Sequence, residues 1–176
     1  MEPELLYKGD YLQLLRKDDW EYAERLNCSG VVFIIAITDD EKIVLIEQFR
    51  VPVGKRLIEI PAGIAGDDHH AGETNETAAK RELVEETGYE AKVLVPLVTG
   101  PVAPGSSSMV MTFYLAQGLK KIGQGGGDHT EDIKVHEVPL SEVDEWLKNK
   151  HGDDLWVDPR VFIALYLLRH RMPKDR

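Results

Sequence analysis

Residues 74–87 predict one α-helix, and its acidic residues restrict what the chain can pack around it. Glu82, Glu85 and Glu86 are spaced by three and four residues, which places their carboxylates on one helical face. Like charges at these spacings destabilise an exposed helix by about 0.2–0.5 kcal/mol per pair. Gly88 suits the end of this helix, because glycine adopts the left-handed backbone of a C-cap without strain. The fold must therefore leave this face in water or place a cation beside it.

Two interpretations of the acidic face are open. Charged stretches on helices are in general solvated surfaces that need no ligand. Alternatively, a hard divalent cation such as Mg²⁺ neutralises the carboxylates, since it takes oxygen ligands and keeps positions for water and phosphate. The second interpretation predicts a metal-assisted reaction on a phosphate ester.

The composition indicates one globular domain spanning residues 1–176. The net charge of -10 argues against nucleic acid as a partner, because binding its backbone requires clustered Lys and Arg. Cys28 is the one cysteine, which excludes an intramolecular disulfide, and we expect its thiol to be a small buried apolar group. The chain has no apolar run of membrane-spanning length, and its N-terminus is acidic. We therefore expect no membrane partner and a cytoplasmic location.

Hydrophobic periodicity and turn residues predict the remaining elements. Residues 31–37 are a continuous β-branched run typical of a buried strand, and a polar turn joins them to a strand at 42–49 as a hairpin. Thr74, Ser141 and Asp158 are the expected helix N-caps. This order predicts an α/β or α+β class built around a mixed sheet, with antiparallel strands at the N-terminus. The expected strands are 11–15, 20–25, 31–37, 42–49, 57–60, 92–99, 109–117 and 133–138, and the expected helices are 74–87, 141–150 and 158–171.

The acidic helix and its flanks carry a longer motif. It reads Glu73, seven residues, Arg81-Glu82-Leu83, one residue, Glu85-Glu86, one residue, Gly88-Tyr89. This motif resembles the Nudix box of the Nudix hydrolases. The box normally begins with a glycine where this chain has Asp67, and Gly63 is the counterpart, so the loop 66–71 resembles an insertion of about four residues. Residues 59–89 are thus the expected box region.

The resemblance implies a fold and a set of roles. The fold is a mixed β-sheet sandwiched between helices. Glu82, Glu85 and Glu86 would all help to hold Mg²⁺, or Mn²⁺ as a substitute, with Glu82 and Glu86 the firmest ligands. Glu73 and Arg81 would form a structural ion pair that braces the loop against the helix rather than taking part in the reaction.

The segment Glu59-Ile60-Pro61-Ala62-Gly63 precedes the box. Pro61 fixes an extended backbone and Gly63 permits a close approach, so a main-chain carbonyl can be aimed at a cation. Plain packing is the alternative for Ala62. Nudix relatives with the same Glu-x-Pro-Ala-Gly pattern use the Ala carbonyl as a metal ligand, which implies Ala62 here. The resemblance also implies that Glu59 lies near the metal or the substrate.

Motifs outside the box resemble the ADP-ribose pyrophosphatase and nucleoside diphosphate sugar hydrolase branch of the family. The resemblance implies that Trp20 and Glu21 hold the nucleobase, by stacking and by accepting a hydrogen bond. It also implies that Arg25 and Arg50 hold the phosphates. Otherwise, Trp20 would be a core or interface aromatic, and Arg50 would form a surface salt bridge. The motifs are Glu47-Gln48-Phe49-Arg50, the Glu-x-Pro-Ala-Gly segment, Trp20-Glu21 with Arg25 four residues on, and Pro104.

The general base is expected on the loop before the last predicted strand. Close relatives carry a catalytic Glu at the position of Glu131, with Asp128 and Asp132 as neighbouring substitutes, and an ordinary solvated acid is the alternative. Residues 125–127 are all glycine, and we expect them to give this loop freedom of movement.

Two features depart from the family pattern. The Pro104 loop continues through three serines to Met109, where many relatives have an acidic residue, so a role of that acid in sugar recognition is in doubt. His69 and His70 lie in the inserted loop without a spaced partner, so a solvated loop is favoured over a metal site.

The expected function is Mg²⁺-dependent hydrolysis of the pyrophosphate bond of nucleoside diphosphate sugars such as ADP-ribose, giving a nucleoside monophosphate and a sugar phosphate. The resemblance implies a homodimer that exchanges its N-terminal strands, residues 1–27. The alternatives are a non-catalytic nucleotide-binding regulator and a hydrolase of another nucleotide, such as GDP-mannose or capped or triphosphorylated RNA.

Overall fold

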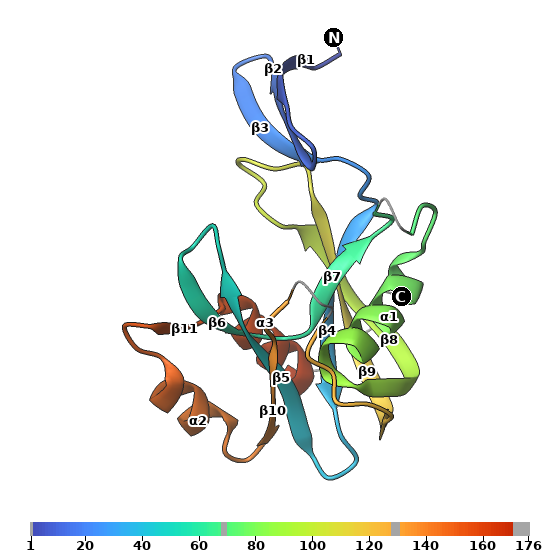
Figure 1. Ribbon diagram of the computed structural model, residues 1–176, viewed down its shortest axis with the longest axis vertical. Helices are drawn as coiled ribbons and strands as arrows, with labels where there is room; N and C mark the ends of the chain where they lie inside the picture. Colours follow the sequence, from blue (N-terminus) through green and yellow to red (C-terminus); the bar gives the residue numbers. More distant parts are fainter. Residues whose placement is uncertain (1, 68–69, 128–130, 171–176) are drawn as a thin grey trace.

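The computed structural model describes residues 2–67, 70–127 and 131–170 (Figure 1). No helix in these ranges is long and apolar enough to cross a membrane. The strands are β1 Glu4–Lys8, β2 Leu12–Lys17, β3 Trp20–Arg25, β4 Gly30–Ile37, β5 Lys42–Arg50, β6 Lys55–Glu59, β7 Ala62–Ala65, β8 Tyr89–Pro101, β9 Val110–Lys121, β10 Lys134–Pro139 and β11 Leu155–Val157. The helices are α1 Asn75–Thr87, α2 Val143–Lys150 and α3 Pro159–His170.

The body of the protein is an eight-stranded mixed sheet in the order β11-β6-β5-β4-β9-β8, with β10 paired to β5 and β7 paired to β4. Strand β4 runs parallel to β9, and β11 runs parallel to β6, while the other pairs are antiparallel. The expected hairpin is present, since Ala36 lies opposite Val44. The prediction of a mixed sheet is therefore confirmed.

Strand β4 is buried on both faces, and its alternating side chains separate two hydrophobic clusters. Val32 and Ile34 pack with Leu83 of α1, whereas Phe33 and Ile35 pack with residues of α2 and α3. Helices thus cover both faces of the sheet (Figure 1), which confirms the expected sandwich. A strand between two helical layers is continuously apolar, which explains the β-branched run.

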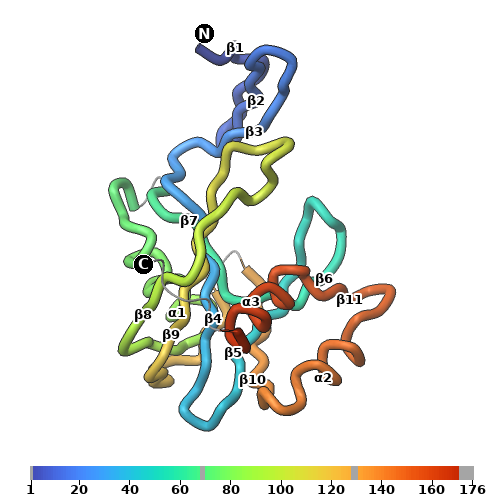
Figure 2. Tube along the Cα trace, turned by 180° about the vertical axis from the view of Figure 1, so that it is seen from behind, coloured from blue at the N-terminus to red at the C-terminus, as the bar shows by residue number. Residues whose placement is uncertain are grey.

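Strands β1–β3 form their own antiparallel sheet, which projects from one end of the body (Figures 1 and 2). It leaves Tyr7 68% and Trp20 63% exposed. The main chain of Ala23 bonds to Ser106 and Ser108, so the loop after β8 ties this sheet to the body. The exposed aromatic side chains make this sheet a candidate contact surface.

The helix caps in the structure agree in part with those predicted from the sequence. The Thr74 hydroxyl accepts a hydrogen bond from the N–H of Thr77 at 3.2 Å, and Gly88 has a φ of 73°, as expected for the two caps. Helix α2 differs from the prediction of a Ser141 cap: Glu142 holds the cap position, and no side chain bonds there. Strands β1, β7 and β11 were not expected, because such short segments carry little alternation of their own.

Candidate active site

The last turns of α1 place two acidic side chains against β7. Glu86 is 2% exposed, and its Oε2 accepts a 2.9 Å hydrogen bond from the main-chain N–H of Ala62. Burial raises the pKa of Glu82 to about 7. Burial also raises the pKa of Glu86 well above its usual value, and repulsion by Glu82 and Glu131 adds to this effect. The two carboxylates are therefore held in a place where water does not compensate their charge.

Gly63 is adjacent to Glu82 in space. A Cβ atom built on residue 63 would lie 1.9 Å from Cδ of Glu82, far inside van der Waals contact. The absence of a side chain at residue 63 therefore lets the β7 backbone and the α1 carboxylate share one small space. Glu82, Glu86 and Ala62 line the same cavity.

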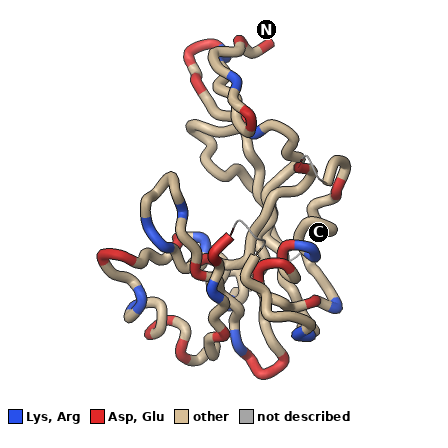
Figure 3. The backbone as a smooth tube through the Cα atoms, viewed as in Figure 1, with Lys and Arg blue, Asp and Glu red and all other residues tan. Residues whose placement is uncertain are grey.

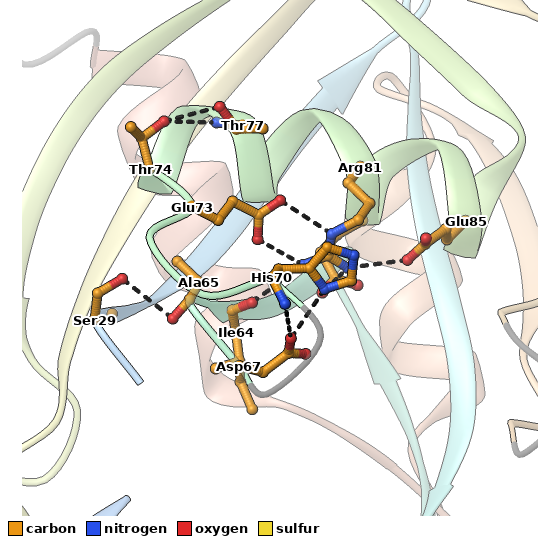
Figure 4. Close-up of polar contacts among 12 residues, drawn as sticks. Ser29, Ile64, Ala65, Asp67, His70, Glu73, Thr74, Thr77, Arg81 and Glu85 are labelled. Carbon is orange, nitrogen blue, oxygen red and sulfur yellow. Dashed lines mark hydrogen bonds and ion pairs between the residues drawn. The ribbon is translucent and has the colours of Figure 1, made fainter. Parts of the chain in front are cut away.

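Arg81 binds several acidic groups at once (Figure 4). Its Nε and Nη2 donate to Glu73 at 3.1 and 3.0 Å, and Nη2 also donates to the carbonyl of Ile64 at 3.2 Å. Its Nη1 donates to Glu82 at 2.8 Å and to Glu85 at 3.0 Å. The expected Glu73–Arg81 ion pair is present, and the contacts of Arg81 join the segment just before α1 and strand β7 to α1.

Glu85 is placed differently from its two neighbours on the helix. Its side chain is 47% exposed and contacts Arg81. Over the described ranges, no three His, Cys, Asp or Glu side chains gather into a metal cluster. The carboxylates beside the Ala62 segment are thus those of Glu82 and Glu86. Such donors fit a hard divalent cation, since it would compensate two buried carboxylates and retain sites for water and phosphate.

A cavity of about 340 Å³ opens beside these residues, and side chains of both charges line it. Its carboxylates are those of Glu82, Glu86, Glu131 and Asp67. The same cavity is lined by three guanidinium groups and by the ring of Phe33. Elsewhere, acidic and basic residues are interspersed along the fold (Figure 3). The guanidinium groups are those of Arg25, Arg50 and Arg160.

Glu59 lies behind the guanidinium groups rather than in the cavity lining. It is 5% exposed, and its Oε2 accepts from Nε of Arg50 at 2.8 Å. Its Oε1 lies 3.8 Å from Nη2 of Arg160. Burial raises the pKa of Glu59, while the charge of Arg50 opposes the shift. Glu59 was expected near the metal or the substrate. Its contacts here are to Arg50 and Arg160, so its role in this chain is to position these two arginines.

The residues expected to bind substrate are brought together only in part. Arg25 and Arg50 line the cavity. Trp20, Glu21 and Pro104 are outside its lining, and Glu21 instead contacts Arg16 at 2.7 Å. Trp20 and Glu21 lie on the projecting sheet, so within one chain they do not face the carboxylates.

The segment before β10 brings Glu131 to the cavity lining. The N–H groups of Gly126 and Gly127 donate to the carbonyls of Glu86 and Glu85 at 2.9 and 3.0 Å, docking the glycine segment on the end of α1. The φ angles of residues 125–127 are 70, 111 and 81°, so these glycines supply left-handed backbone, and the expected freedom of movement stays a prediction. Asp128 lies outside the described residues.

The remaining acidic and histidine candidates have structural contacts. Asp132 binds Nη1 of Arg56 at 2.8 Å. Nδ1 of His70 lies 2.9 Å from Asp67, within the inserted loop, and His69 lies outside the described residues. Cys28 is half-buried and its thiol faces the carbonyl of Gly30 at 3.4 Å.

Arg160 is the cavity residue that the sequence analysis missed. It is the second residue of α3, where the positive end of the helix disfavours a cation. Asp158 offsets this position, because its Oδ1 accepts from the main-chain N–H of Arg160 at 2.7 Å and from Nε at 2.8 Å. The sequence carried one signal for Arg160: a basic residue in the first turn of a predicted helix, where the helix dipole disfavours positive charge.

Comparison with known proteins fits this geometry. A family model for the NUDIX domain matches residues 29–158. The chain belongs to the Nudix family. It is 39% identical over 141 residues to the methanol dehydrogenase activator of Bacillus methanolicus, covering 80% of this chain and 72% of that protein. It is 37% identical to the ADP-ribose pyrophosphatase of Bacillus subtilis, covering 65% of this chain and 60% of that protein.

Other Nudix relatives extend the comparison. The GDP-mannose pyrophosphatase of Escherichia coli K12 is 31% identical over 128 residues, which are 68% of this chain and 64% of that protein. The chain thus spans less than two thirds of both pyrophosphatases. A solved structure described as an ADP compounds hydrolase has a TM-score of 0.70 at 24% identity and covers 97% of this chain and 94% of that one. This structural likeness establishes a common fold.

Proposed function

We propose that this Nudix protein hydrolyses the pyrophosphate bond of nucleoside diphosphate sugars such as ADP-ribose, with Mg²⁺ or substituting Mn²⁺ as cofactor. The observation that supports it most directly is one cavity lined both by the carboxylates of Glu82 and Glu86, of which Glu86 is buried, and by guanidinium groups. Relatives whose names describe ADP-ribose and GDP-mannose pyrophosphatases support the same class of substrate.

Glu82, Glu86 and the carbonyl of Ala62 would hold the metal, with Glu85 as an outer contributor. When bound, the metal supplies charge neutralisation at the diphosphate and favours ionisation of water. Glu131 lines the cavity and would accept the proton of the attacking water as general base.

Arg50 would bind phosphate oxygens with its two terminal nitrogens, since Glu59 engages only its Nε. The water oxygen forms a bond to one phosphorus, and the bond from that phosphorus to the bridging oxygen breaks. The products are a nucleoside monophosphate and a sugar phosphate, and the bridging oxygen leaves with one of them.

We further propose one domain over residues 1–176 that acts as a homodimer through residues 1–27. Trp20 and Glu21 would then serve the cavity of the partner subunit and hold the nucleobase there, with Arg25 and the Pro104 loop nearby. The exposed aromatic side chains of β1–β3 support an intersubunit contact.

Mixing variants tests the shared site. Trp20→Ala and Glu82→Gln proteins, unfolded and refolded together, should regain activity in about a quarter of the sites, because half of the dimers contain one intact composite site. Each variant refolded alone should remain inactive. No recovery in the mixture, together with a monomeric mass in sedimentation, would refute the shared site.

The activity is tested with a panel of ADP-ribose, GDP-mannose and capped and triphosphorylated RNA in Mg²⁺, with identification of the products. Glu82→Gln should lower kcat for the preferred nucleotide by at least about hundredfold. Glu90→Gln, an exposed position just after α1, is the matched control and should leave kcat unchanged. Equal rates for Glu82→Gln and the parent protein would refute the proposal.

A second candidate is a nucleotide-binding regulator of another enzyme. It is favoured by the 39% identity to a methanol dehydrogenase activator over 80% of this chain. Calorimetry that shows nucleotide binding, combined with no turnover of any panel member, would favour the regulator over the hydrolase.

A further inference from the structure

The arginines of the cavity are arranged around one buried acid. Arg50 comes from the end of β5 and Arg160 from the start of α3, and the carboxylate of Glu59 lies between them at 2.8 and 3.8 Å. Each oxygen of Glu59 faces a different arginine. The two guanidinium groups are therefore held near each other although their charges repel.

Arg160 is held more firmly than a surface arginine. Its Nε donates to Oδ1 of Asp158 at 2.8 Å, and its Nη2 pairs with Oδ2 of the same buried carboxylate. Its guanidinium carbon lies 4.8 Å from the centre of the Phe33 ring, which restricts the plane of the group. Asp158 raises the pKa of Arg160, so the group stays charged. Its orientation is fixed before any ligand arrives.

Both arginines keep donors for a ligand. Within the described residues, the hydrogen bonds and ion pairs of Arg160 engage Nε and Nη2, and those of Arg50 engage Nε alone. Arg50 is 40% and Arg160 is 33% exposed at the side chain, and both line the cavity. Terminal N–H groups of two neighbouring guanidiniums are thus available to a ligand in the cavity.

We propose that Arg160 and Arg50 form a clamp for two adjacent phosphate groups, aligned by Glu59. Guanidinium forks bind phosphate oxygens through paired hydrogen bonds, and two such forks at one site favour a ligand with two phosphates. Arg160 is thus a residue that selects diphosphate esters over monophosphate esters. This inference rests on the proposed function for the class of ligand but not for the hydrolysis step.

Binding without turnover tests the clamp. Calorimetry in a chelator, with ADP-ribose against AMP and GDP-mannose against GMP, measures the preference of the parent protein for the two-phosphate member of each pair. Arg160→Gln should weaken the two-phosphate ligand about ten- to hundredfold and the one-phosphate ligand less than about threefold. Arg169→Gln, on the same helix and paired with Asp144, is the matched control and should change neither.

Arg160→Lys separates the clamp from a purely structural role. Lysine keeps a cation beside Asp158 but lacks the fork, so the fold should be retained while the two-phosphate preference falls. If the parent protein shows turnover, Arg160→Lys should raise KM with kcat within about threefold. The clamp is wrong if the parent protein shows no two-phosphate preference in either pair, or if Arg160→Lys retains it in full. Selective binding of the two-phosphate ligands without any hydrolysis would refute the proposed activity and would still support the clamp.

Discussion

The carboxylate of Glu82 occupies the space that a side chain on Gly63 would need. A Cβ atom on residue 63 would lie 1.9 Å from Cδ and 2.0 Å from Oε1 of Glu82. The position of the Glu82 carboxylate on α1 therefore requires a glycine at residue 63 of β7.

Gly63→Ala should displace Glu82 and lower kcat by at least about tenfold, because misplacing a catalytic group by an ångström is costly. The melting temperature should also fall. Gly152→Ala is the control, since a Cβ atom at Gly152 meets nothing within 4 Å. Steady-state rates and thermal unfolding measure both effects, and an unchanged kcat in Gly63→Ala would contradict the expected overlap.

Glu86→Gln should separate activity from stability. Gln keeps an oxygen that accepts from the N–H of Ala62 but removes a charge buried near Glu82, so the melting temperature without metal should stay level or rise. The value of kcat should fall by at least about hundredfold. Glu85→Gln should have a smaller effect on kcat, because Glu85 is exposed and bound to Arg81. Equal losses in the two variants would contradict this order.

Arg81→Ala should lower the free energy of unfolding by about 3–5 kcal/mol, because it leaves the nearly buried Glu73 without its partner. Lys80→Ala removes the neighbouring exposed pair with Glu76 and should cost less than about 1 kcal/mol. Urea unfolding of both variants measures the difference. A similar cost for the two would show that the Arg81 contacts do not brace the fold.

The contribution of His136 to stability should fall when the pH drops below about 6.5, against the opposite contribution of Glu82 and Glu86, whose raised pKa values favour the folded state at lower pH. Burial lowers the pKa of His136 below its usual 6.5, while its bond to Glu47 opposes the shift. The unfolded chain therefore binds the proton at higher pH than the folded one, and stability is lost between pH 6.5 and the lower folded value. The stability of His136→Gln relative to the parent protein should therefore rise as the pH falls through this window, as followed by urea unfolding of both at several pH values. An identical pH profile in the variant would contradict the assignment.

Several features could be predicted because their causes are local. The caps at Thr74 and Gly88 follow from side-chain chemistry and backbone freedom next to the helix. The spacing of Glu82 and Glu86 follows from helical periodicity. The ion pair of Glu73 and Arg81 was expected by resemblance, since eight positions and a loop separate the two residues.

Other features depend on segments that meet only in the folded chain. Strand β11 pairs with β6 about a hundred positions away, and no local pattern marks it. The role of Glu59 depends on Arg160 at the start of the last helix. The hydrogen bonds of Gly126 and Gly127 to the carbonyls of Glu86 and Glu85 could not be predicted, because their acceptors lie on α1, about forty positions earlier in the chain.

The amino-acid sequence by itself determined the acidic helix, the buried central strand and the family motif, since these depend on spacing and composition along the chain. Tertiary structure decided which acids are buried, which arginines share a cavity and which predicted binding residues stay outside it. The physical reason is that burial, desolvation and charge pairing arise from contacts between distant segments. Those contacts bring the acidic face of α1 and the guanidinium groups of Arg50 and Arg160 into one cavity.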